Sequence, residues 1–298
     1  ELAGELSATT GIDLSLQQRG GYSIFLDEQS LEQRLQIYEK LKSELGGHYP
    51  FDVLGHNAIK KEEPHIGRNV VGAILHHEDG HLNPLNFYRA ITQACNAHGL
   101  QKIIGRVSRV EPISDGFTIH SEASGTHQCE KVVLASGLGT VELGRPLGFS
   151  VPIRPQRGQV LITEKMPPLI NRPSDEIRQV NEGAVQIGAS AEEVGTDDSE
   201  TTTTTAALAA NAIQQYPVLA KAQLIRSWGA LRVMSPDGFP IYQQSAQYPG
   251  AYFTTCHSGI TLAAAHARLI PQWLCGEGHQ FNDPDITLDE FSEQRFND

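Results

Sequence analysis

Cysteine, long apolar runs and positive charge are all scarce in this 298-residue chain. Its four cysteines stand apart, with no Cys-x-x-Cys pair, so we expect the reduced thiols that are typical of a cytoplasmic protein. No apolar run approaches the roughly 20 residues that cross a bilayer, and the opening ELAGELSATTG carries no signal-peptide pattern. With 23 Lys and Arg against 35 Asp and Glu, the net charge is −12, which argues against nucleic acid or an anionic membrane surface as a partner.

A histidine-rich and acidic stretch, residues 76–81, raises the question of a metal site. The spacing does not favour one, because neighbouring residues on a strand point to opposite faces and the stretch has no helical His-x-x-x-His pair. We expect instead a strand and a turn that lead into a helix, with Asn83 as its cap and Pro84 at its first position. No metal ligand is therefore predicted.

Apolar periodicity and turn residues predict strands and helices in alternation. Ser30 and Gln33 form a capping-box pattern for one helix, and Pro271 is expected to interrupt the last helix near Leu269. The predicted strands are 21–26, 102–110, 117–121, 132–135, 184–189 and 252–255, and the predicted helices include 30–45, 84–98 and 206–216.

The short apolar run 132–135 is followed by Ser136-Gly137-Leu138-Gly139. A Gly-x-Gly directly after a buried strand lets the backbone approach a phosphate or a ribose closely. The third glycine of the usual nucleotide-binding pattern is missing, because Glu142 holds its place. By itself the motif therefore leaves both a nucleotide contact and an ordinary turn open.

Residues 227–267 carry the densest set of signals. Pro236-Asp237-Gly238 is strong turn chemistry, and it places Arg232 near the end of the incoming strand. After strand 252–255, Ser258 is predicted to cap an Ala-rich helix whose free N–H groups can bind an electron-rich group.

These residues resemble the C-terminal signature of the D-amino-acid oxidase-like flavoproteins, which include glycine and sarcosine oxidases. In that signature a Trp-x-Gly/Ala-Leu-Arg strand, here 228–232, leads to a Pro-Asp-Gly-x-Pro turn, and a later strand enters the loop 256–264. The Cys variant of that loop is most similar to the flavoprotein subunits of amino-acid and opine dehydrogenases and of hydrogen cyanide synthase. The resemblance implies that the protein acts beside other dehydrogenase subunits in a hetero-oligomer.

The resemblance implies a mixed α/β fold in which an FAD-binding Rossmann-like domain is interleaved with an antiparallel-sheet substrate domain. The substrate domain is expected at 1–64 and 151–226, and the FAD-binding domain at 65–150 and 227–298. The family's opening β-α-β unit with Gly-x-Gly-x-x-Gly is not found in these residues. We expect a fragment that binds FAD poorly alone; a truncated gene, or a unit supplied by another chain, are the alternatives.

The implied activity is FAD-dependent oxidation of an amine or small amino acid, of the glycine, D-hydroxyproline, opine or sarcosine type, by hydride transfer to flavin N5. Arg232 is expected to pair with the substrate carboxylate; the alternative is a surface arginine paired with Asp237. His257 is a candidate catalytic residue. Cys256 is either a small buried residue or a covalent flavin attachment. The predicted cofactor-binding residues are Val107, Ala135, Ser136, Gly137, Arg157, Ser258, Gly259, Ile260, Thr261 and Leu262.

Three alternatives accompany these expectations. Arg157 fits a solvated strand residue as well as one that holds flavin or shapes a cavity. The whole chain fits a non-catalytic scaffold subunit that keeps the fold without FAD. An NAD-dependent Rossmann enzyme fits less well, because the Gly-x-Gly lies late in the chain and lacks its third glycine. The sequence does not decide between oxygen and a partner subunit as the electron acceptor.

Overall fold

The computed structural model describes residues 1–276 and 287–296. They form two compact units, each built from several segments. Unit 1 comprises residues 1–95, 157–192 and 197–230, and unit 2 comprises 96–156, 193–196 and the described residues from 231 onward. Within the described residues, no helix is long and apolar enough to cross a membrane.

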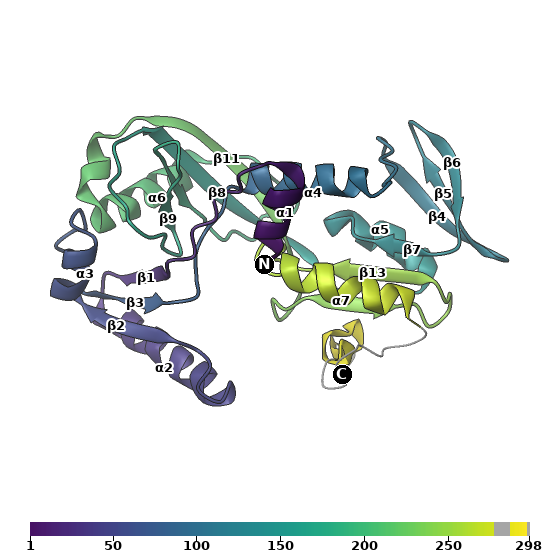
Figure 1. The fold of residues 1–298 in the computed structure, drawn as a ribbon, viewed down its shortest axis with the longest axis horizontal. Helices are drawn as coiled ribbons and strands as arrows, with labels where there is room; N and C mark the ends of the chain where they lie inside the picture. Colours follow the sequence, from purple (N-terminus) through teal and green to yellow (C-terminus); the bar gives the residue numbers. More distant parts are fainter. Residues whose placement is uncertain (277–286, 297–298) are drawn as a thin grey trace. The chain divides into compact units, whose positions relative to one another are not determined.

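The first part of unit 1 is a three-stranded antiparallel sheet in the order β1-β3-β2 (Figure 1). Strand β3 is the central strand and its first four residues are buried, whereas β2 is largely exposed. The elements in chain order are α1 (Leu2–Thr10), β1 (Gly21–Phe25), α2 (Glu28–Glu44), β2 (Phe51–Gly55), α3 (His56–Glu62), β3 (Gly72–His76) and α4 (Pro84–Ala97), whose last two residues belong to unit 2.

The sequence predicted the N-terminal caps of α4 and α2, and the structure confirms only the first of these predictions. The Asn83 cap of α4 is confirmed, because its Oδ1 accepts from the N–H groups of Leu85 and Asn86 at 3.1 and 3.2 Å. The capping box of α2 is wrong: Asp27 is the N-cap, and its Oδ1 accepts from the N–H of Ser30 at 2.8 Å. A carboxylate both accepts this bond and meets the positive end of the helix dipole.

The second part of unit 1 is a four-stranded sheet in the order β11-β8-β10-β9. Its core joins apolar residues of this sheet to α3, β1, β3 and α6, so the two sheets share one apolar interior. The elements are β8 (Arg154–Lys165), β9 (Ile177–Gln179), β10 (Ala184–Gly188), α6 (Thr202–Gln215), a 3₁₀ turn (Pro217–Lys221) and β11 (Leu224–Met234). The first residues of β8 and the last of β11 belong to unit 2.

Unit 2 contains an antiparallel meander, β4-β5-β6, and a second sheet in the order β12-β13-β7. Strands β13 and β7 are parallel, and within the described residues no strand pairs with the other edge of β7. The elements are β4 (Val107–Ile113), β5 (Gly116–Ser121), β6 (Gly125–Cys129), β7 (Val132–Leu134), α5 (Thr140–Gly144), β12 (Ile241–Gln244), β13 (Ala251–Thr255) and α7 (Ala263–Cys275), with 3₁₀ turns at Gly137–Gly139, Arg145–Leu147, Asp289–Phe291 and Glu293–Phe296.

Two expectations for the last helix are wrong. Ser258 is not its cap, since residues 259–262 form turns and α7 begins only at Ala263, after Leu262. Pro271 does not interrupt the helix, which continues to Cys275. Proline removes only one helical hydrogen bond, and Trp273 anchors the following turn, being 3% exposed with its ring 5.0 Å from that of Tyr252.

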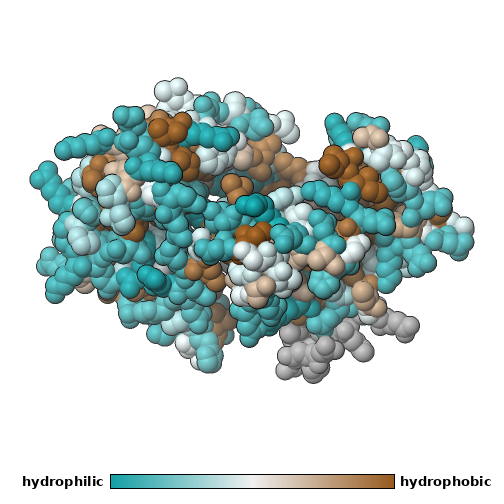
Figure 2. Space-filling view, turned by 45° about the horizontal axis from the view of Figure 1, so that its top comes forward, coloured by the Kyte–Doolittle hydropathy of each residue, from teal (hydrophilic) through white to brown (hydrophobic). Residues whose placement is uncertain are grey.

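The predicted mixed α/β class with antiparallel sheets is confirmed. The face of the molecule in Figure 2 is mostly hydrophilic, with apolar side chains gathered in small groups. The most exposed apolar residues of unit 2 include Ile103 and Ile104, at 54% and 83%. They lie in the irregular segment before β4, where the sequence predicted a strand from residue 102 and the structure begins one at Val107.

Candidate functional site

Unit 2 has a cavity of about 650 Å³ beside strand β7. Its walls come from the start of β4, from β7 itself and from the turn that follows β7. Three predicted cofactor residues, Val107, Ala135 and Ser136, lie together in this lining. Because Val132 and Leu134 are buried while Val133 is 38% exposed, the cavity has an apolar floor next to an open strand edge.

The turn after β7 needs glycine at one position. Gly137 has φ +57°, a conformation that costs a residue with a Cβ about 1–2 kcal/mol. A Cβ there would also lie 3.3 Å from Cγ2 of Val233, which is closer than ordinary contact. The turn is held by a 2.9 Å hydrogen bond between the hydroxyls of Ser136 and Thr140. The backbone after β7 is therefore fixed in the sharp turn that a nucleotide contact requires.

Arg232 lies near the end of β11, within unit 2, and is half-buried. Its Nη1 donates to Oε1 of Gln156 at 3.3 Å, and burial lowers the pKa of its guanidinium. The alternative pairing with Asp237 is wrong, because Asp237 binds Arg295 through bonds of 2.8 and 3.1 Å. Arg232 forms no ion pair with any residue that the structure describes, so its charge is available to an anionic ligand.

The loop before α7 presents three backbone donors. The N–H groups of Gly259, Ile260 and Thr261 bind no acceptor among the described residues, and all three residues are exposed. Leu262, the fourth, is tied back to the carbonyl of Ser258 at 3.0 Å. The turn conformation therefore supplies the free donors that the sequence assigned to a capped helix.

His257 and Cys256 stand at the start of this loop. His257 is exposed, and its Nδ1 lies 3.2 Å from the hydroxyl of Ser258. Cys256 is half-buried, and burial raises the pKa of its thiol. A thiol with a raised pKa is a weak nucleophile at neutral pH. The small buried residue is therefore the interpretation of Cys256 that its surroundings favour.

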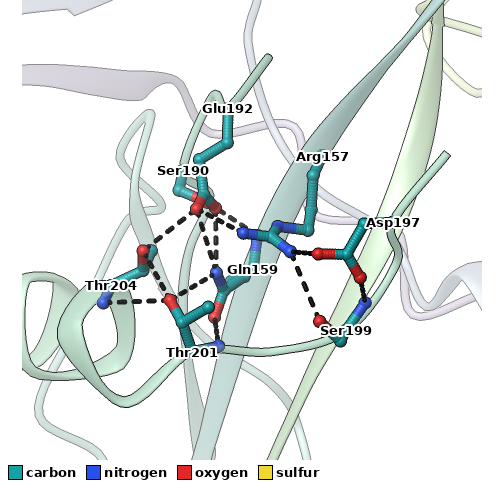
Figure 3. Close-up of polar contacts among 8 residues, drawn as sticks. All are labelled: Arg157, Gln159, Ser190, Glu192, Asp197, Ser199, Thr201 and Thr204. Carbon is teal, nitrogen blue, oxygen red and sulfur yellow. Dashed lines mark hydrogen bonds and ion pairs between the residues drawn. The ribbon is translucent and has the colours of Figure 1, made fainter. Parts of the chain in front are cut away.

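Arg157 lies in unit 1, whereas the other predicted cofactor residues lie in unit 2. Its side chain is 4% exposed, so the solvated-strand interpretation is wrong. Its Nη2 donates to Glu192 at 2.9 Å and its Nη1 to Asp197 at 2.7 Å (Figure 3). Both terminal nitrogens of the guanidinium are thus committed to carboxylates of the same unit.

Glu192 is the centre of this network (Figure 3). Besides Arg157, it accepts from Gln159 at 2.9 Å, from Ser190 at 2.6 Å and from Thr204 at 3.1 Å. The bond from Arg157 first, and then those from Ser190, Gln159 and Thr204, lower the pKa of Glu192 to about 2. The network connects β8, the segment after β10 and the first turn of α6, and its role is to hold those elements together.

Unit 1 also has a cavity of about 530 Å³, which the sequence did not indicate. Trp228 of β11 forms part of its wall. Arg178 of β9 and His81 also line it. Arg178 was missed because β9 has only three residues, but a signal exists: Arg178 follows the buried Ile177, so it points to the face of the strand opposite the core.

A family model and two sequence relatives all indicate the same class of oxidoreductase. The family model described as FAD dependent oxidoreductase (DAO) matches residues 1–273. An opine oxidase subunit from Rhizobium meliloti is 36% identical over 294 residues, which cover 98% of this chain and 77% of that protein. Hydrogen cyanide synthase subunit HcnC of Pseudomonas aeruginosa is 26% identical over 279 residues, covering 89% of this chain and 65% of that protein.

Solved structures show the same fold. Glycine oxidase from Geobacillus kaustophilus superposes with a TM-score of 0.88 at 23% identity, covering 98% of this chain and 78% of that one. L-proline dehydrogenase from P. horikoshii superposes with a TM-score of 0.85 at 15% identity, covering 99% of this chain and 80% of that one.

Proposed function

The chain belongs to the DAO family of FAD-dependent oxidoreductases, and on that premise we propose that it oxidises the C–N bond of an amine or a small amino acid. Arg232 carries this proposal, because it is a half-buried cation without an ion pair in the described residues. We assign flavin binding to unit 2 and substrate-domain residues to unit 1.

The residues of unit 2 fit FAD in two places. The cavity beside β7 has the apolar floor and the sharp glycine turn that suit an adenosine group, with Val107, Ala135, Ser136 and Gly137 as contacts. The free N–H groups of Gly259–Thr261 suit the electron-rich edge of the flavin ring. Arg157 is left out of this assignment, because two carboxylates occupy its guanidinium.

When bound, FAD supplies the acceptor for the hydride that leaves the substrate carbon. The task of this chain is to hold the substrate in place. The planar fork of Arg232 matches a carboxylate in two parallel bonds and so fixes the neighbouring carbon. The exposed ring of His257 is a candidate proton acceptor from the substrate amine.

We further propose that the chain works as one subunit of a hetero-oligomer. Support comes from its relatives in opine oxidase and hydrogen cyanide synthase, since both proteins are named as subunits. The substrate of this chain is proposed only as a class, an amine or amino acid with a carboxylate for Arg232.

The test compares two proteins by visible absorption, the chain itself and a version extended at its N-terminus by the family's opening β-α-β unit. We expect a bound-flavin band in the extended protein that bleaches anaerobically with an amino acid. If neither protein binds flavin, the non-catalytic scaffold takes the place of this proposal.

The role of Arg232 is tested in the extended protein with Arg232→Lys, which keeps the charge but removes the two-bond match. We expect KM to rise at least about tenfold, because a hydrogen bond to a charged group contributes about 1.5–3 kcal/mol. The matched control is Arg109→Lys, an exposed arginine of β4 that pairs with Glu111. Equal KM values in the two variants would remove this role from Arg232.

A further inference from the structure

Gln156 is the residue that meets the guanidinium of Arg232, within unit 2. Its Oε1 accepts from Nη1 of Arg232 at 3.3 Å. A guanidinium has five N–H donors, and one is used here, so the other four have no acceptor among the residues that the structure describes. Among those residues, the bond to Gln156 is therefore the contact that orients the guanidinium.

The backbone register explains why Glu193 lies beside Gln156. Arg157 and Glu192 form an antiparallel bridge, with N···O distances of 2.9 Å in both directions. In an antiparallel pair, the preceding residue of one strand faces the following residue of the other, so Gln156 stands opposite Glu193. Arg154 lies two residues before Gln156 and hence on the same face of β8, and it also binds Glu193.

Glu193 determines which end of the Gln156 amide faces Arg232. An ionised carboxylate accepts hydrogen bonds and donates none, so the end of Gln156 that lies 2.7 Å from Oε1 of Glu193 is the Nε2 group. The amide oxygen is consequently left for Arg232. The hydrogen bonds from Gln156 and Arg154 lower the pKa of Glu193, so this carboxylate stays ionised at neutral pH. The orientation of the amide is therefore fixed by the charge of Glu193.

An amide oxygen holds an arginine in place without neutralising it, because a carboxamide carries no net charge. Arg157 of unit 1 shows the other arrangement: carboxylates bind both of its terminal nitrogens, and its charge is compensated within the fold (Figure 3). Arg232 meets the amide of Gln156 instead of a carboxylate. The acidic residue nearest to it in the sequence, Asp237, is bound by Arg295. Arg232 thus combines a fixed position with an uncompensated charge.

We propose that Gln156 is a positioning residue for Arg232, and that its neutral amide keeps the guanidinium oriented and charged for a substrate carboxylate. The inference rests on the proposed function of Arg232 and adds the residue that prepares it. A carboxylate in place of the amide would compete with the substrate for the same N–H donors. An apolar side chain in its place would keep the charge of Arg232 but lose its fixed orientation.

The experiment measures binding without turnover, by isothermal titration calorimetry of the extended protein at pH 7. The probes are (methylthio)acetate and (methylthio)acetamide, which have nearly the same shape but differ in the charge that Arg232 would meet. We expect the wild-type protein to bind the acid at least about tenfold more tightly, the ratio that one carboxylate–arginine pair supplies. Gln156→Glu should abolish that preference, and Gln156→Met should keep part of it. Gln128→Glu, which adds the same charge at an exposed residue of β6 in the same unit, should leave it unchanged.

A comparison in a second background separates positioning from a structural role. If Gln156 acts through Arg232, Gln156→Glu should change the ratio of the two affinities far less in Arg232→Met protein, because no guanidinium remains to be neutralised. A merely structural role would weaken the binding of both probes alike and would persist without Arg232. Circular dichroism of each variant establishes that it is folded, and Gln156→Met carries the test should Gln156→Glu unfold.

The outcomes distinguish this inference from the function on which it rests. Equal binding of the two probes by the wild-type protein, or a preference that survives Arg232→Met, would remove the carboxylate role of Arg232 and this inference with it. A preference that Arg232→Met abolishes and Gln156→Glu leaves intact would overturn the inference alone. An equal loss in Gln128→Glu would also overturn it, because any added negative charge would then suffice.

Discussion

At the scale of single residues, Glu192 accepts hydrogen bonds from four side chains. Because these bonds exist only in the folded protein, the pKa of Glu192 differs between the folded and unfolded states. The folded-state pKa is about 2, below the ordinary value of 4.5. A lowered carboxyl pKa contributes stability that is present above about pH 4.5 and is lost as pH falls toward 2. We expect the free energy of unfolding, measured by urea titration, to decrease across that window in the wild-type protein.

Glu192→Gln removes this contribution at its source. The variant keeps the shape and leaves Arg157 paired with Asp197 alone, so the loss should be smaller than the roughly 3–5 kcal/mol that an uncompensated buried charge costs. Urea titrations at pH 7 and pH 3 should show a lower stability at pH 7 and a shallower fall toward pH 3 than in wild type. A parallel pH dependence in the two proteins would mean that other carboxyls dominate.

Gly137 and Gly139 offer a matched pair in one turn. Gly137→Ala places a Cβ at φ +57° and 3.3 Å from Val233, so we expect a loss of about 1–2 kcal/mol. Gly139 has φ −65°, and its Cβ would meet nothing closer than 3.7 Å, so Gly139→Ala should cost far less. Thermal unfolding of the two variants checks the difference. Similar losses of stability in the two variants would show that crowding near β7, and not the positive φ of Gly137, determines the cost of adding a Cβ.

At the scale of elements, the start of α2 separates two side chains that both look like caps. Asp27→Ala should cost about 1 kcal/mol, because Asp27 accepts the N–H of Ser30. Ser30→Ala keeps that backbone donor and removes only a hydroxyl that itself donates to Asp27, so we expect a smaller loss. Urea denaturation of both variants measures the order. A larger effect at Ser30 would restore the capping box.

The interior proline of α7 gives a change in the opposite direction. Pro271→Ala returns an N–H to the middle of the helix, and we expect the protein to become more stable by about 1 kcal/mol, well under the full 3 kcal/mol scale because the helix already accommodates the ring. Trp273→Ala removes a ring that is 3% exposed and should cost about 3–5 kcal/mol. Calorimetric melting of both variants tests the pair, and a destabilised Pro271→Ala would contradict this account.

Local chemistry made some elements predictable and left others out of reach. The cap of α4 followed from Asn83 and Pro84 alone, since both act within one turn. Strand β9 has three residues, too few for a periodic pattern, and it exists because it pairs with β10. The state of Arg232 depended on Arg295, which takes Asp237 from 58 positions away. Residues close in the sequence do not predict which of two arginines, Arg232 or Arg295, pairs with Asp237.

At the scale of the whole molecule, the open edge of β7 determines how well the chain should bind its cofactor. No described strand covers that edge, and the chain has no Gly-x-Gly-x-x-Gly loop to hold a pyrophosphate. We expect weak FAD binding by this chain in a flavin-fluorescence titration, and tighter binding once a β-α-β unit with that loop is added. Tight stoichiometric FAD on the chain alone would contradict this expectation.

The boundaries of the two units fall inside β8 and β11, and also at 95/96, 192/193 and 196/197. Neither unit is therefore one continuous stretch of chain. A single recombination event could not exchange one whole unit, and a single protease cut could not separate the two units. No single continuous segment of the gene encodes one whole unit. A single crossover between relatives therefore never exchanges one whole unit, and one that falls between residues 96 and 230 leaves both units hybrid.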